Sequence, residues 1–323
     1  MSTYERPESL TPWLQQGPVL MGVANVTPDS FSDGGRFSSQ AGGIDYVAAV
    51  DHAQRLIQLG AAIVDVGGEA SSFFRPGIAS VPAEQQIERI VPVIRRLRTG
   101  RPVVRANPNL SVLISVDTRS SEVAREALLA GAGIVNDISA GTHDPAMLAT
   151  VAELGAAIVL MHMRPEQPGQ MAPTYTNVVD EVCEYLQDRA MAAKQAGIPA
   201  ERIILDPGIG FGKSTADNWK LVAGLSRLVT LRYPVLLGVS RKRFLAEVLP
   251  ADRRSAAPEH WIDRDLATAV VTAMAMAAGV QIHRVHNVEL AAQSLAITRG
   301  SANISGSVFQ LGCPEGVPKV ALL

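Results

Sequence analysis

The sequence has few cysteines, little net charge and no long apolar run, and each absence narrows the possible functions. Only Cys183 and Cys313 occur in 323 residues, far apart in sequence, so at most one disulfide can form, and reduced thiols in a cytoplasmic protein are the favoured interpretation. With 29 basic and 31 acidic residues, the chain has no electrostatic footprint for nucleic acid or an anionic membrane. A transmembrane helix needs about 18 or more consecutive apolar residues, and the sequence has no such run. The first residues also lack the apolar segment of a signal peptide, so none is expected.

What the sequence does have is a repeated unit of helix, glycine and strand. It occurs as "LIQLGAAIVDVGG" (56–68), "ALLAGAGIVNDIS" (127–139) and "VAELGAAIVLMHM" (151–163). In each copy a glycine stands where a helix C-cap belongs, because glycine adopts the left-handed conformation at little cost. The Val/Ile/Leu runs that follow do not alternate with polar residues, which is typical of parallel strands covered by helices.

The repetition predicts a single-domain α/β fold, a (β/α)8 TIM barrel. Eight βα units within one chain of this length fit a closed barrel. A doubly wound open sheet is the alternative, but no G-x-G-x-x-G follows any strand, and eight regular units favour closure. The eight strands are expected near residues 19–25, 63–67, 112–117, 134–138, 157–162, 203–206, 235–240 and 282–286. The expected organisation is an N-terminal extension (1–18), the barrel (19–300) and a C-terminal tail (301–323).

Polar residues stand where the predicted strands end. In parallel α/β folds the carboxyl ends of the strands form the ligand site. The long polar loop that begins "NVTPDSFSDGG" (25–35) follows the first strand and is therefore expected to belong to a site. The strand-end residues are Asn25, Asp65, Glu69, Asp117, Asn136, Asp137, His162, Asp206, Ser240, Arg284 and His286.

Some of these residues have a purely structural alternative. An Asp after a strand is often a helix N-cap, but Thr118 or Ser120 can cap the helix after Asp117, which frees that carboxylate. Asp206 is followed by "PGIGFGK", which is not a helix start, whereas Asp137 could serve only to brace its loop. A zinc site built on histidines lacks a close-spaced ligand pair. His283 lies on the strand face opposite to His286 and could be a structural residue.

The remaining residue types suggest what the site binds. "GVSRKRF" (238–244) is either a solvated charge run or, at a strand end, an anion site, and Arg75 and Arg284 add guanidinium groups suited to phosphate oxygens. The carboxylates after the third and sixth strands, with Asn136, would accept hydrogen bonds from an amidine-like ring such as a 2-amino-4-oxopyrimidine. Together they indicate a phosphorylated heterocycle as the ligand.

In their order along the chain these motifs resemble those of the dihydropteroate synthase family. They are "NVTPDSFSDGG", "DVGGE…RPG", "SVDT", "VNDI", "LMHM", "LDPGIGFGK", "GVSRK" and "RVH", and the resemblance covers about residues 19 to 300. It implies a (β/α)8 barrel that joins 6-hydroxymethyl-7,8-dihydropterin pyrophosphate to 4-aminobenzoate, giving 7,8-dihydropteroate and pyrophosphate in folate synthesis. It also implies Mg²⁺ as cofactor and a homodimer.

The resemblance implies a role for each matched residue. The pterin would be bound by Asp117, Asn136, Met161, Asp206, Phe211, Gly238 and Lys242. The pyrophosphate would be bound by Asn25, Arg75, Arg284 and His286, with Asn25 also contacting Mg²⁺. The aminobenzoate would lie near Phe74 and Ser240, and the catalytic residues would be Asp33, Arg75 and Lys242.

One segment departs from the family pattern. The loop "GGEASSFFRPG" (67–77) is three residues longer than the family's "GGESTRPG", and Phe74 replaces the Thr before Arg75. Ser72, Phe73 or Phe74 is therefore expected to reshape the aminobenzoate pocket and alter sulfonamide sensitivity; the alternative is a loop variant without effect. Two rival functions are a methyltetrahydrofolate corrinoid methyltransferase and a non-catalytic pterin-binding protein. The methyltransferase has no pyrophosphate to bind and so does not explain "NVTPDSFSDGG", "SRK" and "RVH", which suit an anionic leaving group. The retained Asn25, Arg75, Lys242, Arg284 and His286 argue against a non-catalytic site, and the longer loop leaves that alternative open.

Overall fold

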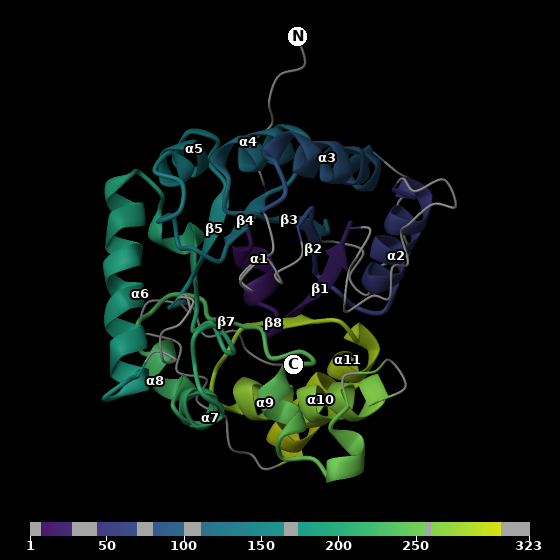
Figure 1. Ribbon diagram of the computed structural model, residues 1–323, viewed down its shortest axis with the longest axis vertical. Coiled ribbons are helices and arrows are strands. Elements are labelled where there is room, and N and C mark those ends of the chain that lie inside the picture. Colours follow the sequence, from purple (N-terminus) through teal and green to yellow (C-terminus); the bar gives the residue numbers. More distant parts are fainter. Residues whose placement is uncertain are drawn as a thin grey trace.

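Eight parallel strands form a barrel that is ringed by helices (Figure 1). The computed structural model describes residues 8–27, 44–69, 80–99, 111–164, 174–255, 257 and 260–304. The strands are β1 (Val19–Asn25), β2 (Ile63–Gly67), β3 (Leu113–Asp117), β4 (Ile134–Asp137), β5 (Ala157–Met161), β6 (Ile203–Asp206), β7 (Leu236–Leu237) and β8 (Ile282–Val285).

The strand order shows a nearly closed barrel. The hydrogen-bonded order is β6-β5-β4-β3-β2-β1-β8-β7, and a parallel bridge between Leu205 and Val235 joins the two ends. The predicted TIM barrel is thereby confirmed. Seven of the eight predicted strands lie within one residue of the observed bounds. The remaining prediction, 235–240, is wrong in length, because β7 spans only Leu236–Leu237 and the chain turns between Val239 and Lys242.

The helices lie around the outside of the barrel, except α1, which lies across one end of it (Figure 1). They are α1 (Thr11–Leu14), α2 (Tyr46–Gln58), α3 (Ala83–Thr99), α4 (Ser121–Leu129), α5 (Met147–Glu153), α6 (Val178–Gln195), α7 (Thr215–Ala223), α8 (Leu225–Val229), α9 (Arg243–Ala246), α10 (Trp261–Ala277) and α11 (Val288–Ile304). Side-chain N-caps set the first residue of several helices. Ser120 caps α4 by accepting from the Val123 amide, as one of the two predicted alternatives required.

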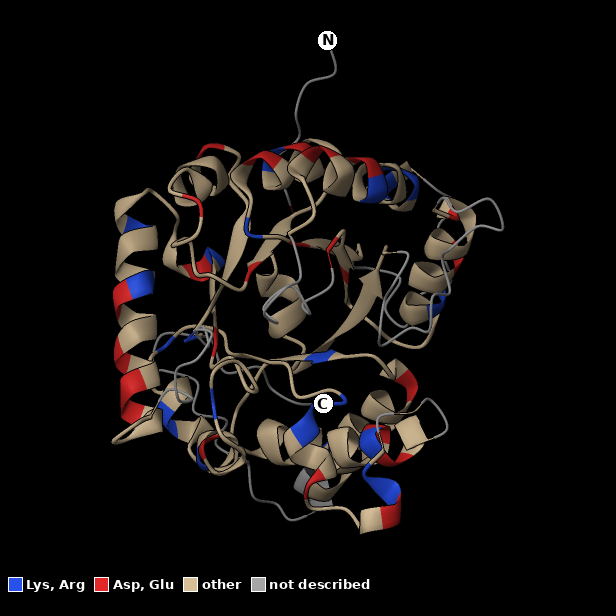
Figure 2. Cartoon of the chain, in the orientation of Figure 1, with Lys and Arg blue, Asp and Glu red and all other residues tan. Residues whose placement is uncertain are grey.

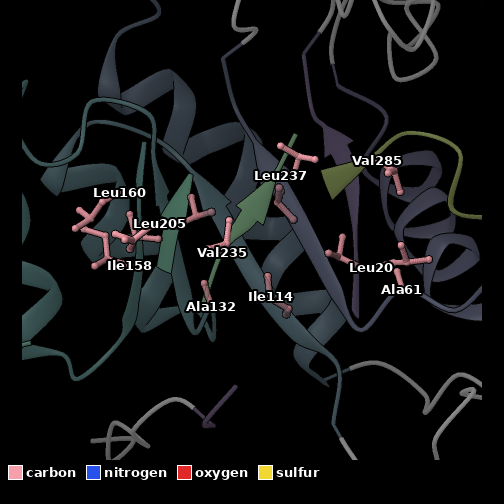
Figure 3. Close-up of a cluster of buried hydrophobic side chains, with 14 of the residues drawn as sticks. Leu20, Ala61, Ile114, Ala132, Ile158, Leu160, Leu205, Val235, Leu237 and Val285 are labelled. Carbon is pink, nitrogen blue, oxygen red and sulfur yellow. The ribbon is translucent and has the colours of Figure 1, made fainter. Parts of the chain in front are cut away.

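The core has two layers, set by the alternation of side chains along each strand. Outward-facing residues such as Leu20, Ile114 and Leu205 pack between the sheet and the helices, as the cluster in Figure 3 shows. The residues between them in the strands, among them Met21 and Ile63, fill the barrel interior. Burying one such side chain stabilises the fold by about 1.5–3 kcal/mol. The barrel is therefore a packed core and leaves room for a site only at its rim.

Helix α1 covers the end of the barrel where the strands begin. Leu10 is buried against the inner cluster, with Trp13 and Leu14 packed beside it. The Trp13 indole N–H donates to the Ser111 carbonyl at 3.0 Å. The opposite end, where the strands finish, is the end that carries the polar residues.

Basic and acidic residues both occur on the outer helices that the structure describes (Figure 2). Figure 2 shows Lys/Arg and Asp/Glu side by side on the outer helices. Among the described residues, no helix has the length and apolar character required to cross a membrane. Cys183 is buried and free, and Cys313 lies outside the described residues.

Candidate active site at the carboxyl ends of the strands

Three of the predicted site residues, Asn25, Asp117 and Asn136, lie level with one another on the strands, with Gly67 between the first two. Asn25 pairs with Gly67, Gly67 with Asp117, and Asp117 with Asn136. Each residue is an even number of positions from an inward-facing member of the inner cluster on its own strand, so its side chain points toward the barrel axis. A Cβ at Gly67 would lie 2.9 Å from Asn25 Oδ1, so the glycine leaves room for the Asn25 side chain at this level.

Arg284 on β8 links the carboxylates of β2 and β3. Its Nε lies 2.7 Å from Asp65 Oδ2, and its Nη2 lies 2.9 Å from Asp117 Oδ2. Asn136 Nδ2 donates to the same Asp65 oxygen at 3.1 Å. Burial raises the pKa of Asp117 to about 7 against the opposing charge of Arg284. The predicted pyrophosphate ligand Arg284 is thus oriented by two carboxylates at the same rim.

The loop after β6 is pressed against the end of β5. Asp206 Oδ1 accepts the Gly208 amide at 2.7 Å, and burial raises the pKa of Asp206 against the opposing charge of Lys242. Gly208 has φ +65°, and a Cβ there would lie 1.9 Å from the His162 carbonyl oxygen. Only glycine fits this left-handed, tightly packed position, which explains the first glycine of "DPGIGFGK".

Lys242 reaches across to this loop from the turn after β7. Its ammonium lies 4.5 Å from the centre of the Phe211 ring and donates to the Ile209 carbonyl. Burial lowers the pKa of Lys242 to about 8, although Asp206 opposes the shift. Met161 is buried on β5 and pairs in register with Asp206. The structure therefore brings together the cation, the aromatic ring and the carboxylate predicted to surround the heterocycle.

Ser240 and His286 form a second contact at the rim. Ser240 Oγ accepts the His286 amide at 3.1 Å and lies 2.8 Å from the ring Nδ1. Burial holds the pKa of His286 well below its usual value, and the cations Arg241 and Arg284 add to the shift. The ring is therefore neutral at pH 7. Gly238 borders open space. Among the described residues, the only atom within 4 Å of a Cβ built at this position is Arg284 Cβ, at 3.9 Å.

Three predicted site residues, Asp33, Phe74 and Arg75, lie outside the described residues, and their roles stay predictions. The two ends of the longer loop are nevertheless defined. Glu69 Oε1 accepts the Ser80 hydroxyl at 2.9 Å and the Val81 amide at 2.6 Å. Glu69 therefore holds residues 69 and 80 side by side at the base of the segment that contains the three extra residues.

Two strand-end residues face away from the axis. Asp137 accepts from the Ser139 amide at 2.8 Å and from the Gly141 amide at 2.6 Å, so it braces its loop, as the structural alternative held. His162 Nδ1 lies 2.9 Å from the ammonium of Lys213. Burial lowers the pKa of His162 to about 3. The part of the chain that the structure describes contains no group of three or more His, Cys, Asp or Glu able to hold a metal ion.

Two residues with marked roles in the site were not singled out from the sequence. Lys213 ends the "GIGFGK" motif and is buried beneath the site, where burial lowers its pKa to about 7. Asp265 lies on the buried face of α10 and pairs with Arg241. A charged residue on the buried side of a predicted helix is the signal that could have found Asp265.

Fold and site together define an α/β barrel whose strand ends bring carboxylates, an amide and cations together at one rim. Residues 21–286 match the family described as pterin binding enzyme. The dihydropteroate synthase of Streptococcus pyogenes serotype M6 is 42% identical over 276 residues, covering 85% of this chain and 92% of the relative. That of Escherichia coli K12 is 38% identical over 285 residues, covering 88% and 92%.

Solved structures agree. The Xanthomonas albilineans dihydropteroate synthase in complex with indole-2-carboxylic acid and 6-chloroguanine has a TM-score of 0.74 at 39% identity, covering 89% of this chain and 94% of that one. The same enzyme in complex with 7,8-dihydropteroate has a TM-score of 0.70 at 36% identity, with the same coverage. The chain belongs to the dihydropteroate synthases of the pterin-binding enzyme family, and it is a transferase.

Proposed function

We propose that this chain joins 6-hydroxymethyl-7,8-dihydropterin pyrophosphate to 4-aminobenzoate, with 7,8-dihydropteroate and pyrophosphate as products. The observation that carries the proposal is the arrangement of hydrogen-bond acceptors and cations on one inner rim. Asp117 and Asp206 offer carboxylates to a ring rich in N–H groups, with Lys242 on the other side of that ring, while Arg284 offers positive charge to the phosphates. The structures of relatives with 4-aminobenzoic acid and with 7,8-dihydropteroate support it.

In this proposal the pterin lies between the ends of β3, β4 and β6 and the turn after β7. Asp117, Asn136 and Asp206 bind its polar edge, while Lys242 approaches from the opposite side. Apolar walls come from Met161 and Phe211, and the open space at Gly238 admits the ring. These roles are supported by the inward direction of the three polar residues and by the contact of the Lys242 ammonium with the Phe211 ring.

The leaving group would be bound by Asn25, Arg75, Arg284 and His286. Asp65 and Asp117 occupy Nε and Nη2 of Arg284, so the plane of the guanidinium is fixed and Nη1 is left for the pyrophosphate. A neutral His286 can accept the Ser240 hydroxyl at Nδ1 and donate its Nε2–H to a phosphate oxygen. Such donors stabilise the charge that develops as pyrophosphate leaves.

The reaction would be a substitution at the exocyclic methylene of the pterin. The C–O bond to pyrophosphate breaks, the ring carboxylates stabilise the positive charge left on the pterin, and the arylamine forms the new C–N bond and releases a proton. Ser240 and Phe74 would contact the aminobenzoate, and Asp33 and Arg75 would close over both substrates. Every protein group in this sequence binds or orients, so no covalent intermediate with the chain is needed.

Mg²⁺ fits the residues present. Magnesium is commonly held by one or two protein oxygens together with substrate phosphates and waters. Asn25 supplies an amide oxygen at the rim, kept clear of side chains on its β2 side by Gly67. When bound, the ion would neutralise charge on the pyrophosphate.

We also propose that the chain forms a homodimer, and the exposed face of α10 supports this. Four apolar side chains spaced four residues apart lie on the exposed face of that helix. They are Ile262, Leu266, Val270 and Met274, which are 52%, 49%, 61% and 50% exposed, and Ile297 on the neighbouring α11 is 74% exposed. A continuous exposed apolar stripe marks an interaction surface. The few cysteines, with Cys183 free, support a cytoplasmic location.

The longer loop would modify the aminobenzoate site. We expect Ser72, Phe73 or Phe74 to change its shape, so that deleting three residues between Glu69 and Arg75 alters the inhibition constant for a sulfonamide. The deletion does not remove Glu69 or Ser80, whose hydrogen bond joins the two ends of the segment. An unchanged inhibition constant in an active deletion variant would contradict this role for the loop.

The proposed reaction is tested by measuring pyrophosphate release from the pterin pyrophosphate with Mg²⁺, with and without 4-aminobenzoate. We expect release that depends on 4-aminobenzoate, together with equimolar dihydropteroate. Binding of the pterin without turnover would contradict the proposed activity while keeping the pterin site, and would point to the longer loop.

A further inference from the structure

Helix α10 carries one buried carboxylate, Asp265, that faces the loops of the active site. Its side chain is 4% exposed. Oδ1 lies 2.7 Å from Arg241 Nε, and Oδ2 lies 3.0 Å from Arg241 Nη2, so the two groups pair through two hydrogen bonds. The same Oδ2 accepts the side-chain amide of Asn287 at 3.2 Å. A buried ion pair is weak as a source of stability, because desolvation opposes the attraction, so its geometry calls for another explanation.

The backbone of Arg241 is held in a conformation that non-glycine residues seldom adopt. Its φ is +59°, in the left-handed region. Residues of α10 fix it on every side. Thr268 Oγ1 accepts the Arg241 amide at 3.2 Å, Arg264 Nη1 donates to the Arg241 carbonyl at 3.2 Å, and the guanidinium carbon lies 4.5 Å from the centre of the Trp261 ring. Such conformations persist where the surroundings determine them, and they cluster at functional sites.

This turn decides where its two neighbours point. Ser240, on one side of Arg241, reaches His286, and Lys242, on the other side, reaches the Phe211 ring. The second partner of Asp265, Asn287, directly follows His286. One carboxylate thus holds both loops that present Ser240, Lys242 and His286.

The sequence left Arg241 open as part of an anion site, and the structure corrects that interpretation. The Arg241 guanidinium pairs with Asp265 and lies over the Trp261 ring. Its charge is matched by a carboxylate beneath the loop. The cation therefore fastens the loop to α10.

We propose that Asp265 is a positioning residue for the reaction. It holds Arg241 and Asn287, and through them it sets the spacing of Ser240, Lys242 and His286 around the substrates. The inference rests on the proposed function, because it concerns residues given substrate-binding roles there. A displacement of about 1 Å in such groups can reduce turnover by about a hundredfold.

The test is a double-mutant cycle of Asp265→Asn and Arg241→Gln, with steady-state kinetics for both substrates. We expect each single variant to lower kcat by at least about tenfold and to raise KM for 4-aminobenzoate. We expect the double variant to be no worse than the poorer single variant, since both changes remove the same interaction. Additive losses, or unchanged kinetics in either folded single variant, would overturn the proposal.

Asp263 provides a matched control on the same helix. It lies two residues before Asp265, and its carboxylate pairs at 3.1 Å with Arg253, whose side chain is 57% exposed. Asp263→Asn makes the same chemical change at a residue that does not pair with Arg241 or Asn287. We therefore expect kcat and KM to stay at the wild-type values. A loss equal to that of Asp265→Asn would show that α10 acts only through its general stability, which would also overturn the proposal.

A second variant covers the case in which Asp265→Asn does not fold. Thr268→Val removes the acceptor of the Arg241 amide without changing any charge, and it should lower kcat in the same direction by a smaller factor. Wild-type kinetics in that variant would count against the proposal.

A readout independent of turnover separates the inference from the proposed function. A wild-type protein that makes no dihydropteroate would refute the proposed function alone. The ¹⁵N shift of His286 Nδ1, assigned with His286→Ala, then decides the inference. This chemical shift must change in Asp265→Asn, because the Ser240–His286 hydrogen bond is altered. If Asp265→Asn does not fold, the same change is expected in Thr268→Val. An unchanged shift would overturn the proposal.

Discussion

Asp117 is subject to two opposing effects in the site. Burial favours its neutral acid, while the guanidinium of Arg284, 2.9 Å away, favours the carboxylate, and the balance raises its pKa to about 7. Lys242 shows the mirror image, because burial favours its neutral amine and lowers its pKa to about 8. Both groups therefore titrate close to neutral pH, which is common at catalytic and binding sites.

We predict a narrow bell-shaped pH dependence of kcat/KM for the pterin pyrophosphate. Activity should rise as pH increases through about 7, because Asp117 must be ionised to accept a hydrogen bond from the ring. It should fall above about 8, because Lys242 loses its proton. Initial rates from pH 5.5 to 9.5 test this, since the profile reports the free enzyme. Lys242→Arg should move the alkaline limb upward; a flat profile across this range would contradict both assignments.

Lys213 is expected to hold the glycine-rich loop in place. Its ammonium lies 2.9 Å from the Gly208 carbonyl, 3.1 Å from the Phe211 carbonyl and 2.9 Å from His162 Nδ1. Lys213→Met leaves His162 Nδ1 and the Phe211 carbonyl without this donor, while the Gly208 carbonyl still accepts the Phe211 amide, and the loss should destabilise the fold by about 1–3 kcal/mol. It should also raise KM for the pterin, because Phe211 moves. Urea unfolding and kinetics test the pair of effects; a matched change at the exposed Lys220, Lys220→Met, should do neither.

At this scale the sequence predicts which residue types gather, but not how they pair. The alternation of inward and outward positions can be counted along each strand, and it separates Asp117 from Asp137 without a structure. The contacts of Arg284 cannot be counted in this way. They join residues 219 and 167 positions apart, and they depend on how three strands are brought together.

Among the elements, β8 shows the cost of placing a polar side chain on its outer face. His283 is 1% exposed, and neither ring nitrogen has a hydrogen-bond partner within the described part of the chain. Burial lowers its pKa to about 4. The folded protein therefore holds the neutral ring, whereas the unfolded chain binds a proton near pH 6.5.

We predict that this histidine makes the protein less stable in acid. Because the unfolded state binds more protons, the free energy of unfolding should fall as pH drops from about 6.5 to about 4, by about 3 kcal/mol in all. Urea unfolding at pH 7 and pH 5 measures the loss. His283→Leu should flatten this dependence. An equal pH dependence in His283→Leu would assign the effect to other groups.

Elements were predictable where an apolar run is bounded by a glycine cap and a polar residue. Strand β2 is such a case, because Gly60 precedes it and the polar residue Glu69 follows it. Strand β7 was not, because the apolar run continues through "LLGVS" while sheet pairing stops at Leu237. Pairing ends there because the chain must turn toward Arg241, whose conformation is imposed by α10 and cannot be read from the local sequence.

On the scale of the whole molecule, the two ends of the barrel have separate tasks. Helix α1 closes the end where the strands begin, and the site occupies the end where they finish. The division into an extension, a barrel and a tail remains a prediction. The part of the extension around Leu10 nevertheless packs against the inner cluster. Composition alone did not indicate this, because a four-residue helix has too few positions to show a period.

This separation leads to a prediction that links stability and function in opposite ways. Leu10→Ala removes a side chain that is 5% exposed and leaves a cavity beneath the barrel, so the free energy of unfolding should fall by about 2–4 kcal/mol. At a temperature well below the melting transition, kcat and both KM values should stay unchanged, because the substitution lies at the end opposite to the site. Denaturant unfolding and kinetics on one preparation test both parts, with Gln15→Ala on the exposed side of the same segment as control. Unchanged stability would show that α1 does not seal the core, and a loss of kcat in a fully folded variant would show that the two ends of the barrel are coupled.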